Sequence, residues 1–384
     1  MKRLYILGNG FDLYMGMKTS YNDFFENGGY SSIKKEINIK NKIQTLSIRC
    51  PENIFDLKSE IEKVSEKIFS LIGEKINNLF LLYLVISNNE LIYWQNVEKQ
   101  IKPYIKCAKE ALKNIEMSIE EERIIEHLSS EEIEMEMEEI KGNYEKIEKI
   151  LKKLILKKFI RNKCDKNDKN IILRELNKFE KEFGQYIKNL DNPLQVNSFD
   201  TVTEKIENVF NNFQDDLKES GINVITFNYT NYLKEYFKVF VNIHGTTENT
   251  IFGIDSKEAE ENHQYIYFTK TSRVLEANIE KKEIVSPLSG IQNTEEIVFF
   301  GYSLAEADYS YFQSIFDYYD IYNNTEIKLK FLYYNYSDKV KENIHTSVMK
   351  LINTYGKSLD NKDKGSNLLH KLLLESRIKI VEIK

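Results

Sequence analysis

Short apolar runs in the last third of the chain alternate with longer segments of helical periodicity. The runs are rich in β-branched and aromatic residues and predict buried strands at 223–227, 240–243, 296–300 and 328–334. Helical patterns follow the first, third and fourth of these runs, at 232–237, 305–319 and 338–354. Strands that alternate with helices favour a mainly parallel sheet, which residues 3–7 would join as a further strand.

The middle of the chain has a helical pattern almost throughout. Its clearest part is an a/d repeat that predicts a coiled-coil seam or a long helical hairpin, formed by Ile133, Met137, Ile140, Tyr144, Ile147, Leu151 and Leu154. We therefore predict two domains. Residues 1–49 and 216–384 form the sheet domain, and residues 50–215 form a large all-α insertion with long helices.

Charge is segregated along this helical zone. Glutamate dominates residues 116–139, whereas lysine and arginine dominate residues 146–163. The two segments either attract each other across a hairpin or form a docking surface for a partner. The seam is either internal or joins two subunits, so a homo-oligomer through the helical region is one expected partnership.

The overall charge and the cysteines limit the classes of function. The formal net charge is −6, so there is no general basic surface and a nucleic-acid partner is not expected. The cysteines are far apart and indicate a reducing, cytoplasmic compartment: Cys50, Cys107 and Cys164. The N-terminal apolar run is too short for a signal peptide, and the strongest apolar stretch, 79–86, is too short to span a membrane.

A glycine turn follows the first predicted strand. It reads Gly8, Asn9, Gly10, Phe11 and Asp12 and lies directly before a helix. Glycines at this position let backbone N–H groups approach a phosphate. The alternative is an ordinary tight turn, in which Asp12 caps the helix rather than contacting a ribose hydroxyl.

Three further polar or glycine breaks occur at strand ends. Asn228 lies between Thr226 and Thr230, and is either a helix cap or the edge of a ligand site. His244, before Gly245, is either a structural or a catalytic histidine. The segment 301–308 contains Gly301, Ser303 and Asp308. Ser303 with Glu306 matches a capping box, and Asp308 is expected in the first turn of the next helix. No histidine pair has metal-ligand spacing, so no metal is expected.

The first of these motifs closely resembles the opening of the AbiH abortive-infection family. The resemblance covers the block from Leu4 to Leu13, followed by Gly16, Thr19, Tyr21, Asp23 and Phe24. The segment 93–98, with Trp94 and Glu98, looks like that family's Trp-and-Glu segment. The motifs at 226–229, 244–245 and 301–308 complete the pattern. The resemblance implies a bacterial protein of phage defence, whose phage-derived trigger the sequence does not show.

The same motifs, in the same order, resemble more distantly those of sirtuins and of sirtuin-like NAD hydrolases. The turn at 8–10 takes the place of the sirtuin glycine motif, Asn228 and His244 match the strand-end Asn and the catalytic His, and Gly301 with Ser303 matches a later nucleotide contact. This resemblance implies a Rossmann-like, sirtuin-like domain with NAD as substrate or ligand. Three dispersed cysteines cannot form the four-Cys zinc module of sirtuin deacylases. The sirtuin Pro-Asp-Phe-Arg run is replaced by residues 20–24, which lack the Arg.

The leading hypothesis is hydrolysis of NAD to nicotinamide and ADP-ribose. His244 would be the general base and Asn228 would orient the water. The nucleotide would be held by Gly8, Asn9, Gly10, Phe11, Asp12, Tyr229, Gly301, Ser303 and Asp308. Trp94 and Glu98 would close the pocket from the helical insertion, unless they are simply a core Trp and a surface Glu. The alternative is a non-hydrolytic module that senses a nucleotide or ADP-ribose and signals through the helical region. A nuclease is a third possibility, disfavoured by the acidic net charge.

Overall fold

The computed structural model describes residues 2–38, 41–42, 54–72, 75–87, 97–116, 144–165, 170–190, 192–196, 199–210, 221–256, 263–279, 293–302, 304, 308–359 and 365–383. The chain divides into two compact units. The first consists of Met1–Ser20 and Lys181–Lys384, and the second is Tyr21–Glu180. The domain boundaries expected from the sequence, after residues 49 and 215, stay predictions.

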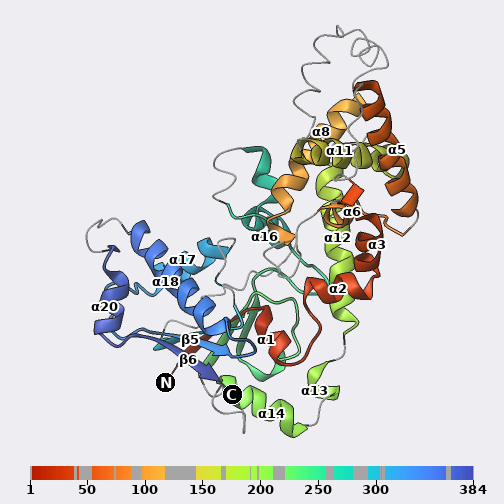
Figure 1. The fold of residues 1–384 in the computed structure, drawn as a ribbon. Coiled ribbons are helices and arrows are strands. Elements are labelled where there is room, and N and C mark those ends of the chain that lie inside the picture. The colour runs from red at the N-terminus through yellow and green to blue at the C-terminus, as the bar shows by residue number, and fades with distance from the viewer. Residues whose placement is uncertain are drawn as a thin grey trace. The chain divides into compact units, whose positions relative to one another are not determined.

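The first unit is built on a six-stranded sheet in which every neighbouring pair is parallel (Figure 1). Its strands are β1 (Arg3–Leu7), β2 (Ile222–Thr226), β3 (Val239–Asn242), β4 (Glu296–Phe300), β5 (Lys328–Tyr334) and β6 (Ile378–Ile383). The strand order is β3-β2-β1-β4-β5-β6. The predicted mainly parallel sheet is therefore confirmed, with β6 as a strand that the sequence analysis did not predict.

Both faces of the central strands are buried, which explains why these strands appear as continuous apolar runs in the sequence. On one face, Leu4 and Ile6 of β1 belong to a core that includes residues of α17 (Tyr309–Tyr318), α18 (Val340–Ser358) and α20 (Leu368–Leu374). On the other face, Tyr5 and Leu7 belong to a core shared with α1 (Asn9–Tyr14) and α14 (Phe199–Phe210). The alternation of side chains along β1 thus serves two separate cores.

The order of the strands reverses at β1. The chain passes from β1 to β2 and β3 on one side, and then returns to β4, β5 and β6 on the other. The connections after the adjacent strands β1 and β4 therefore lead toward opposite ends of the strand order. In open parallel sheets this topological switch point is where ligands bind.

The remaining elements of the first unit connect these layers. They are α13 (Pro193–Val196), η1 (Lys234–Tyr236), η2 (His263–Phe268) and α16 (Lys270–Ile279). The helix predicted at 232–237 is wrong, because this segment forms only the short 3₁₀ turn η1. The side-chain amide of Asn242 donates to the carbonyls of Asn228 and Thr230, and so holds the start of this connection as a loop. The predicted helix at 338–354 corresponds to α18, and the one at 305–319 to α17, while residues 305–307 lie outside the described part.

The second unit is helical in the residues that the structure describes. It contains α2 (Tyr21–Asn27), α3 (Tyr30–Ile37), α5 (Ile54–Ile72), α6 (Leu79–Ile86), α8 (Ile101–Glu116), α11 (Tyr144–Lys163) and the larger part of α12 (Ile171–Lys188). The apolar helix α6 is completely buried. Asn78 caps it through the Leu81 N–H, and a carboxylate oxygen of Glu175 accepts the N–H of Leu79.

The predicted heptad seam is described only in part. Ile147 and Leu151 of α11 are fully buried, and α11 packs against α8, α5 and α6. Leu154, the last predicted seam position, is only partly buried. The seam positions Ile133, Met137 and Ile140 and the glutamate-rich segment 117–139 lie outside the described residues. The hairpin and the homo-oligomer therefore stay predictions. Within the described residues, no helix has the length and hydropathy needed to cross a membrane.

Candidate functional site

The glycine turn after β1 lies directly against the loop after β4. The N–H of Gly8 donates to the Phe300 carbonyl at 3.0 Å, and the N–H of Gly10 donates to the Gly301 carbonyl at 2.7 Å. A Cβ at Gly10 would lie 2.7 Å from the Gly301 Cα, and a Cβ at Gly301 would collide with the backbone nitrogen of Phe11. The glycines thus permit a close approach of two backbones, and both of these N–H groups are bonded within the protein.

The other residues of this turn have distinct contacts. The Asn9 side-chain oxygen accepts from the Thr19 hydroxyl at 2.7 Å, which ties the turn to the segment after α1. Phe11 is buried, with its ring stacked on Tyr232 at 6.5 Å and edge-on to Phe300 at 6.1 Å. Both residues shape the turn.

Asp12 is buried, with 1% of its surface exposed, and faces hydroxyl groups. The Thr230 hydroxyl lies 3.0 and 2.8 Å from its two carboxylate oxygens, and the Tyr232 hydroxyl donates at 3.2 Å. Burial raises the pKa of Asp12 to about 7, although hydrogen bonds from Thr230, Tyr232 and Asn228 act in the opposite direction. Burial and the neighbouring Asp12 hold the pKa of Tyr232 well above its usual value, so Tyr232 remains a donor.

Asn228 is also buried and follows β2 at the same edge of the sheet. Its backbone N–H donates to the Thr226 hydroxyl at 3.1 Å, and its side-chain amide donates to the Gly8 carbonyl at 3.1 Å. The side-chain oxygen Oδ1 has no hydrogen-bond partner among the described residues. A buried polar atom left in this way costs free energy unless a water or a ligand pairs with it.

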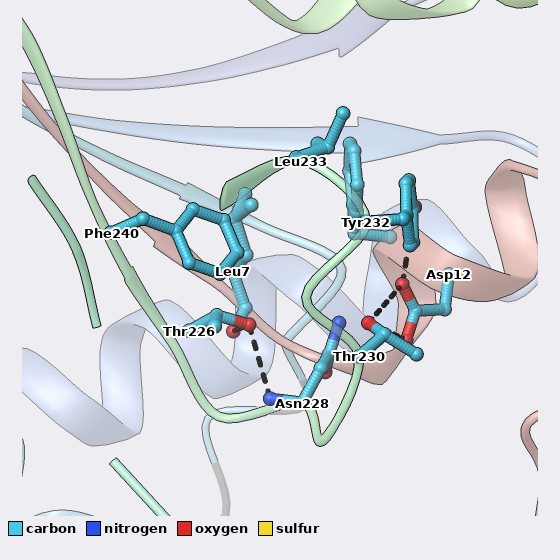
Figure 2. A pocket seen from close by; sticks show the side chains of 9 residues that line it. Leu7, Asp12, Thr226, Asn228, Thr230, Tyr232, Leu233 and Phe240 are labelled. Carbon is cyan, nitrogen blue, oxygen red and sulfur yellow. Dashed lines mark hydrogen bonds between the residues drawn. The ribbon is translucent and has the colours of Figure 1, made fainter. Parts of the chain in front are cut away.

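Asp12 and Asn228 line one small pocket with a cavity volume of about 10 Å³ (Figure 2). Figure 2 shows the hydroxyls of Thr230 and Tyr232 directed at the Asp12 carboxyl, with Leu7 and Phe240 across from it. The complete lining is Leu7, Phe11, Asp12, Thr226, Asn228, Thr230, Tyr232, Leu233 and Phe240. A cavity of this size has room for about one water molecule, so a nucleotide does not fit into it as it stands.

A second buried polar cluster consists of His244, Lys270, Tyr302 and Asp308. The ammonium of Lys270 lies 2.5 Å from Oδ1 of Asp308, and the Tyr302 hydroxyl donates to the other carboxylate oxygen. Nε2 of His244 lies 3.3 Å from the same Oδ1, without hydrogen-bond geometry to any described residue. Lys270 is only 2% exposed at its side chain, so this ion pair is shielded from water.

Burial and the charge of Lys270 together determine the electrostatics of this second cluster. Burial alone would raise the pKa of Asp308, but the charges of Lys270 and His244 and the hydrogen bonds from Lys270 and Tyr302 lower it overall. Burial, and then the charge of Lys270, lower the pKa of His244 to about 3 against the opposing effect of Asp308. At neutral pH the cluster therefore contains an ionised carboxylate, an ammonium and a neutral imidazole.

Asp308 differs from its predicted place. It precedes α17 at the N-cap position rather than lying in the first turn, and its side chain forms no capping hydrogen bond. The reason is that its carboxylate is engaged by Lys270 and Tyr302.

The structure places the remaining predicted residues as follows. The Tyr229 hydroxyl donates to the Ile251 carbonyl at 3.1 Å, and its buried ring packs near Phe183 and Phe252. Glu98 is buried, so its interpretation as a surface residue is wrong. Trp94 and Ser303 lie outside the described residues.

Lys270, Tyr302, Thr230 and Tyr232 were not predicted as site residues. Thr230 and Tyr232 follow Asn228 at alternate positions in the same loop, and that proximity was a usable signal. Lys270 gave none, because a lysine at the start of α16 looks like an ordinary surface residue in the sequence. No group of three or more histidines, cysteines or carboxylates suited to hold a metal occurs among the residues that the structure describes.

Fold and site together define a parallel α/β protein with two buried polar clusters at the C-terminal edge of its sheet. Residues 4–333 match the family model described as bacteriophage abortive infection AbiH. The chain belongs to this family, which suggests a role in defence against phage. No curated protein and no solved structure matches the chain significantly.

Proposed function

We propose that this protein acts in abortive infection by hydrolysing NAD to nicotinamide and ADP-ribose at the C-terminal edge of its sheet. The observation that carries the proposal is the pocket beside the switch point, where the buried Oδ1 of Asn228 has no partner among the described residues. The strand order β3-β2-β1-β4-β5-β6, which is that of doubly wound dinucleotide-binding sheets, supports it. The motifs that resemble those of sirtuins lie on the loops of this same edge.

The proposed chemistry needs few groups. Water would replace nicotinamide at the ribose, with Asn228 orienting either the water or the ribose hydroxyl through Oδ1. Burial and the charge of Lys270 lower the pKa of His244 to about 3, so its imidazole is neutral at pH 7. The glycine turn, Gly301 and Asp308 would help to bind the dinucleotide, which does not fit into the present cavity of about 10 Å³. Binding would therefore require the loop after β4 to move away from Gly10.

A second candidate is a module that binds a nucleotide or ADP-ribose without hydrolysis and signals through the helical unit. Two observations favour it. The N–H groups of Gly8 and Gly10 are bonded within the protein, and Nε2 of His244 lies beside the carboxylate of Asp308 and close to the charge of Lys270. A site closed in this way is suited to a sensor that changes conformation when a ligand opens it.

The test is incubation of the purified protein with NAD, with and without extract from phage-infected cells, followed by chromatography of the products. Wild type, Asn228→Ala and His244→Ala are compared with His345→Ala, which changes an exposed histidine on α18. Nicotinamide and ADP-ribose from wild type and His345→Ala, but not from Asn228→Ala, support the hydrolase. Products that persist in His244→Ala leave the hydrolase standing and exclude His244 as its base. Binding of ADP-ribose in calorimetry without any product supports the sensor. If the protein neither forms these products nor binds ADP-ribose, both candidate functions are contradicted.

A further inference from the structure

The pocket beside β1 and β2 contains one carboxyl group, that of Asp12. Next to it lies Oδ1 of Asn228, which has no hydrogen-bond partner among the described residues. The two residues are brought together because β1 and β2 are paired in register, with Leu7 opposite Thr226 at their C-terminal ends. His244, which the resemblance to sirtuins suggests as the base, does not line this pocket. Among the residues proposed for catalysis, a molecule in the pocket would therefore contact Asp12 and Asn228 rather than His244.

The surroundings of Asp12 suit proton exchange. The groups in contact with its carboxyl are two hydroxyls and an amide, from Thr230, Tyr232 and Asn228. Tyr232 is the titratable group among them, and it stays protonated because its own pKa is far above neutral. With the pKa of Asp12 raised to about 7 by burial, both of its protonation states are accessible at physiological pH.

His244 is less suited to accept a proton. Its imidazole is buried, which disfavours a positive charge on the ring, and the nearby ammonium of Lys270 would repel that charge as well. Asp308, which offsets this repulsion in part, is already paired with Lys270 at 2.5 Å. A conjugate acid with a pKa of about 3 makes a weak base near pH 7.

We propose that Asp12 is the catalytic base of the hydrolysis, with Thr230 and Tyr232 as residues that position its carboxylate. This inference rests on the proposed function. A water held by Oδ1 of Asn228 forms a bond from its oxygen to the anomeric carbon of the ribose and gives a proton to the Asp12 carboxylate. The bond from that carbon to the nicotinamide nitrogen breaks, and its electron pair stays on the nitrogen, which loses its positive charge. Asp12 then releases the proton to solvent.

The experiment is the rate of nicotinamide release from NAD as a function of pH, under the conditions in which wild type is active. For wild type the rate rises with pH through about 7, because the base acts when ionised. Asp12→Asn lowers the rate by about 10²–10⁴-fold and abolishes the rise. Tyr232→Phe removes one donor to the carboxylate, so the rise moves to higher pH while activity at high pH is retained.

Tyr319→Phe is the matched control. Tyr319 is a buried tyrosine whose hydroxyl bonds to Thr294 at 3.0 Å, away from the pocket, so its variant keeps the wild-type profile. Circular dichroism checks that each variant is folded, and if Asp12→Asn is not, the profile of Tyr232→Phe decides. An Asp12→Asn enzyme with the wild-type rate and profile overturns the inference and leaves the hydrolase standing, as does an unmoved profile in Tyr232→Phe. A wild type that neither releases nicotinamide nor binds ADP-ribose overturns the proposed function itself, and this inference with it.

Discussion

Two buried aspartates at the same edge of the sheet have opposite electrostatic surroundings. Asp12 faces hydroxyl and amide donors, and burial raises its pKa to about 7. Asp308 is also buried but lies 2.5 Å from the ammonium of Lys270, and its pKa is lowered overall. One carboxyl is therefore available for proton exchange at neutral pH, whereas the other is a permanent negative charge.

This difference in pKa gives the two aspartates separate roles at one edge of the sheet, one in proton exchange and one as a fixed charge. Pairs of titratable groups whose pKa values are driven apart commonly mark acid–base and electrostatic partners in active sites. Here the difference follows from a single residue: Lys270 neighbours Asp308, while Asp12 is surrounded by uncharged donors. The cluster with the ion pair holds the loop after β4 in place, and the cluster without a cation lines the pocket.

Removal of the cation is expected to have the largest effect. Lys270→Met leaves the Asp308 carboxylate buried without its partner, so the free energy of unfolding should fall by about 3–5 kcal/mol in chemical denaturation. Lys371→Met is the control, since the pair of Lys371 with Glu375 is about one-third exposed and should cost less than about 1 kcal/mol. Equal losses of unfolding free energy in Lys270→Met and Lys371→Met would contradict the special role of Lys270 beside Asp308.

The pH dependence of stability distinguishes the two aspartates next. The pKa of Asp12 is raised from 3.8 to about 7, so protonated Asp12 favours the folded state below pH 3.8 and this advantage is lost as pH rises through 7. The stability of wild type relative to Asp12→Asn should fall over that range by roughly 4 kcal/mol, an upper figure for a fully buried group.

Asp308 should behave in the opposite sense. Its pKa is lowered on folding, so its contribution is present above the ordinary pKa of an aspartate and is lost as pH falls through the lowered value. Urea denaturation of wild type, Asp12→Asn and Asp308→Asn at several pH values measures both slopes. Slopes of the same sign for the two variants would contradict the account.

The contact between the two loops should have the smallest of these effects. Gly301 has a φ of +66° and touches Gly10 and Phe11, whereas Gly16 has a φ of +90° with no atom near a built Cβ. Both alanine variants lose stability because alanine is strained in the left-handed backbone conformation, but Gly301→Ala must also displace the glycine turn. Thermal unfolding should therefore show an additional loss of about 1–3 kcal/mol for Gly301→Ala. A loss no greater than that of Gly16→Ala would mean that the two loops separate easily.

The sequence was sufficient for most of the sheet. The strands at 3–7, 223–227, 240–243, 296–300 and 328–334 were predicted within a residue, because strands buried on both faces are continuous apolar runs. The strand β6 (Ile378–Ile383) was missed, since its polar residues Lys379 and Glu382 interrupt the apolar pattern. The helix at 232–237 was wrong because contacts from Asn242, which lies further along the chain, hold the preceding residues as a loop.

The site was predictable in its positions but not in its electrostatics. Asp12, Asn228, His244 and Asp308 all follow strands of a parallel sheet, and that rule alone brings them to one edge. The partnership of Lys270 with Asp308 joins residues 38 positions apart, and nothing local in the sequence indicates it. Because neither the burial of His244 nor the position of Lys270 can be read from the sequence, the sequence alone presents His244 as a titratable base and Asp308 as an ordinary helix residue.

The measurement that tests the central claim most directly is infrared difference spectroscopy of the carboxyl groups at about pH 6, where exposed carboxyls are ionised. The spectrum of wild type minus Asp12→Asn should contain a band from one protonated, buried carboxylic acid. The spectrum of wild type minus Asp308→Asn should contain only a carboxylate band. A protonated band that disappears in Asp308→Asn and persists in Asp12→Asn would contradict the account.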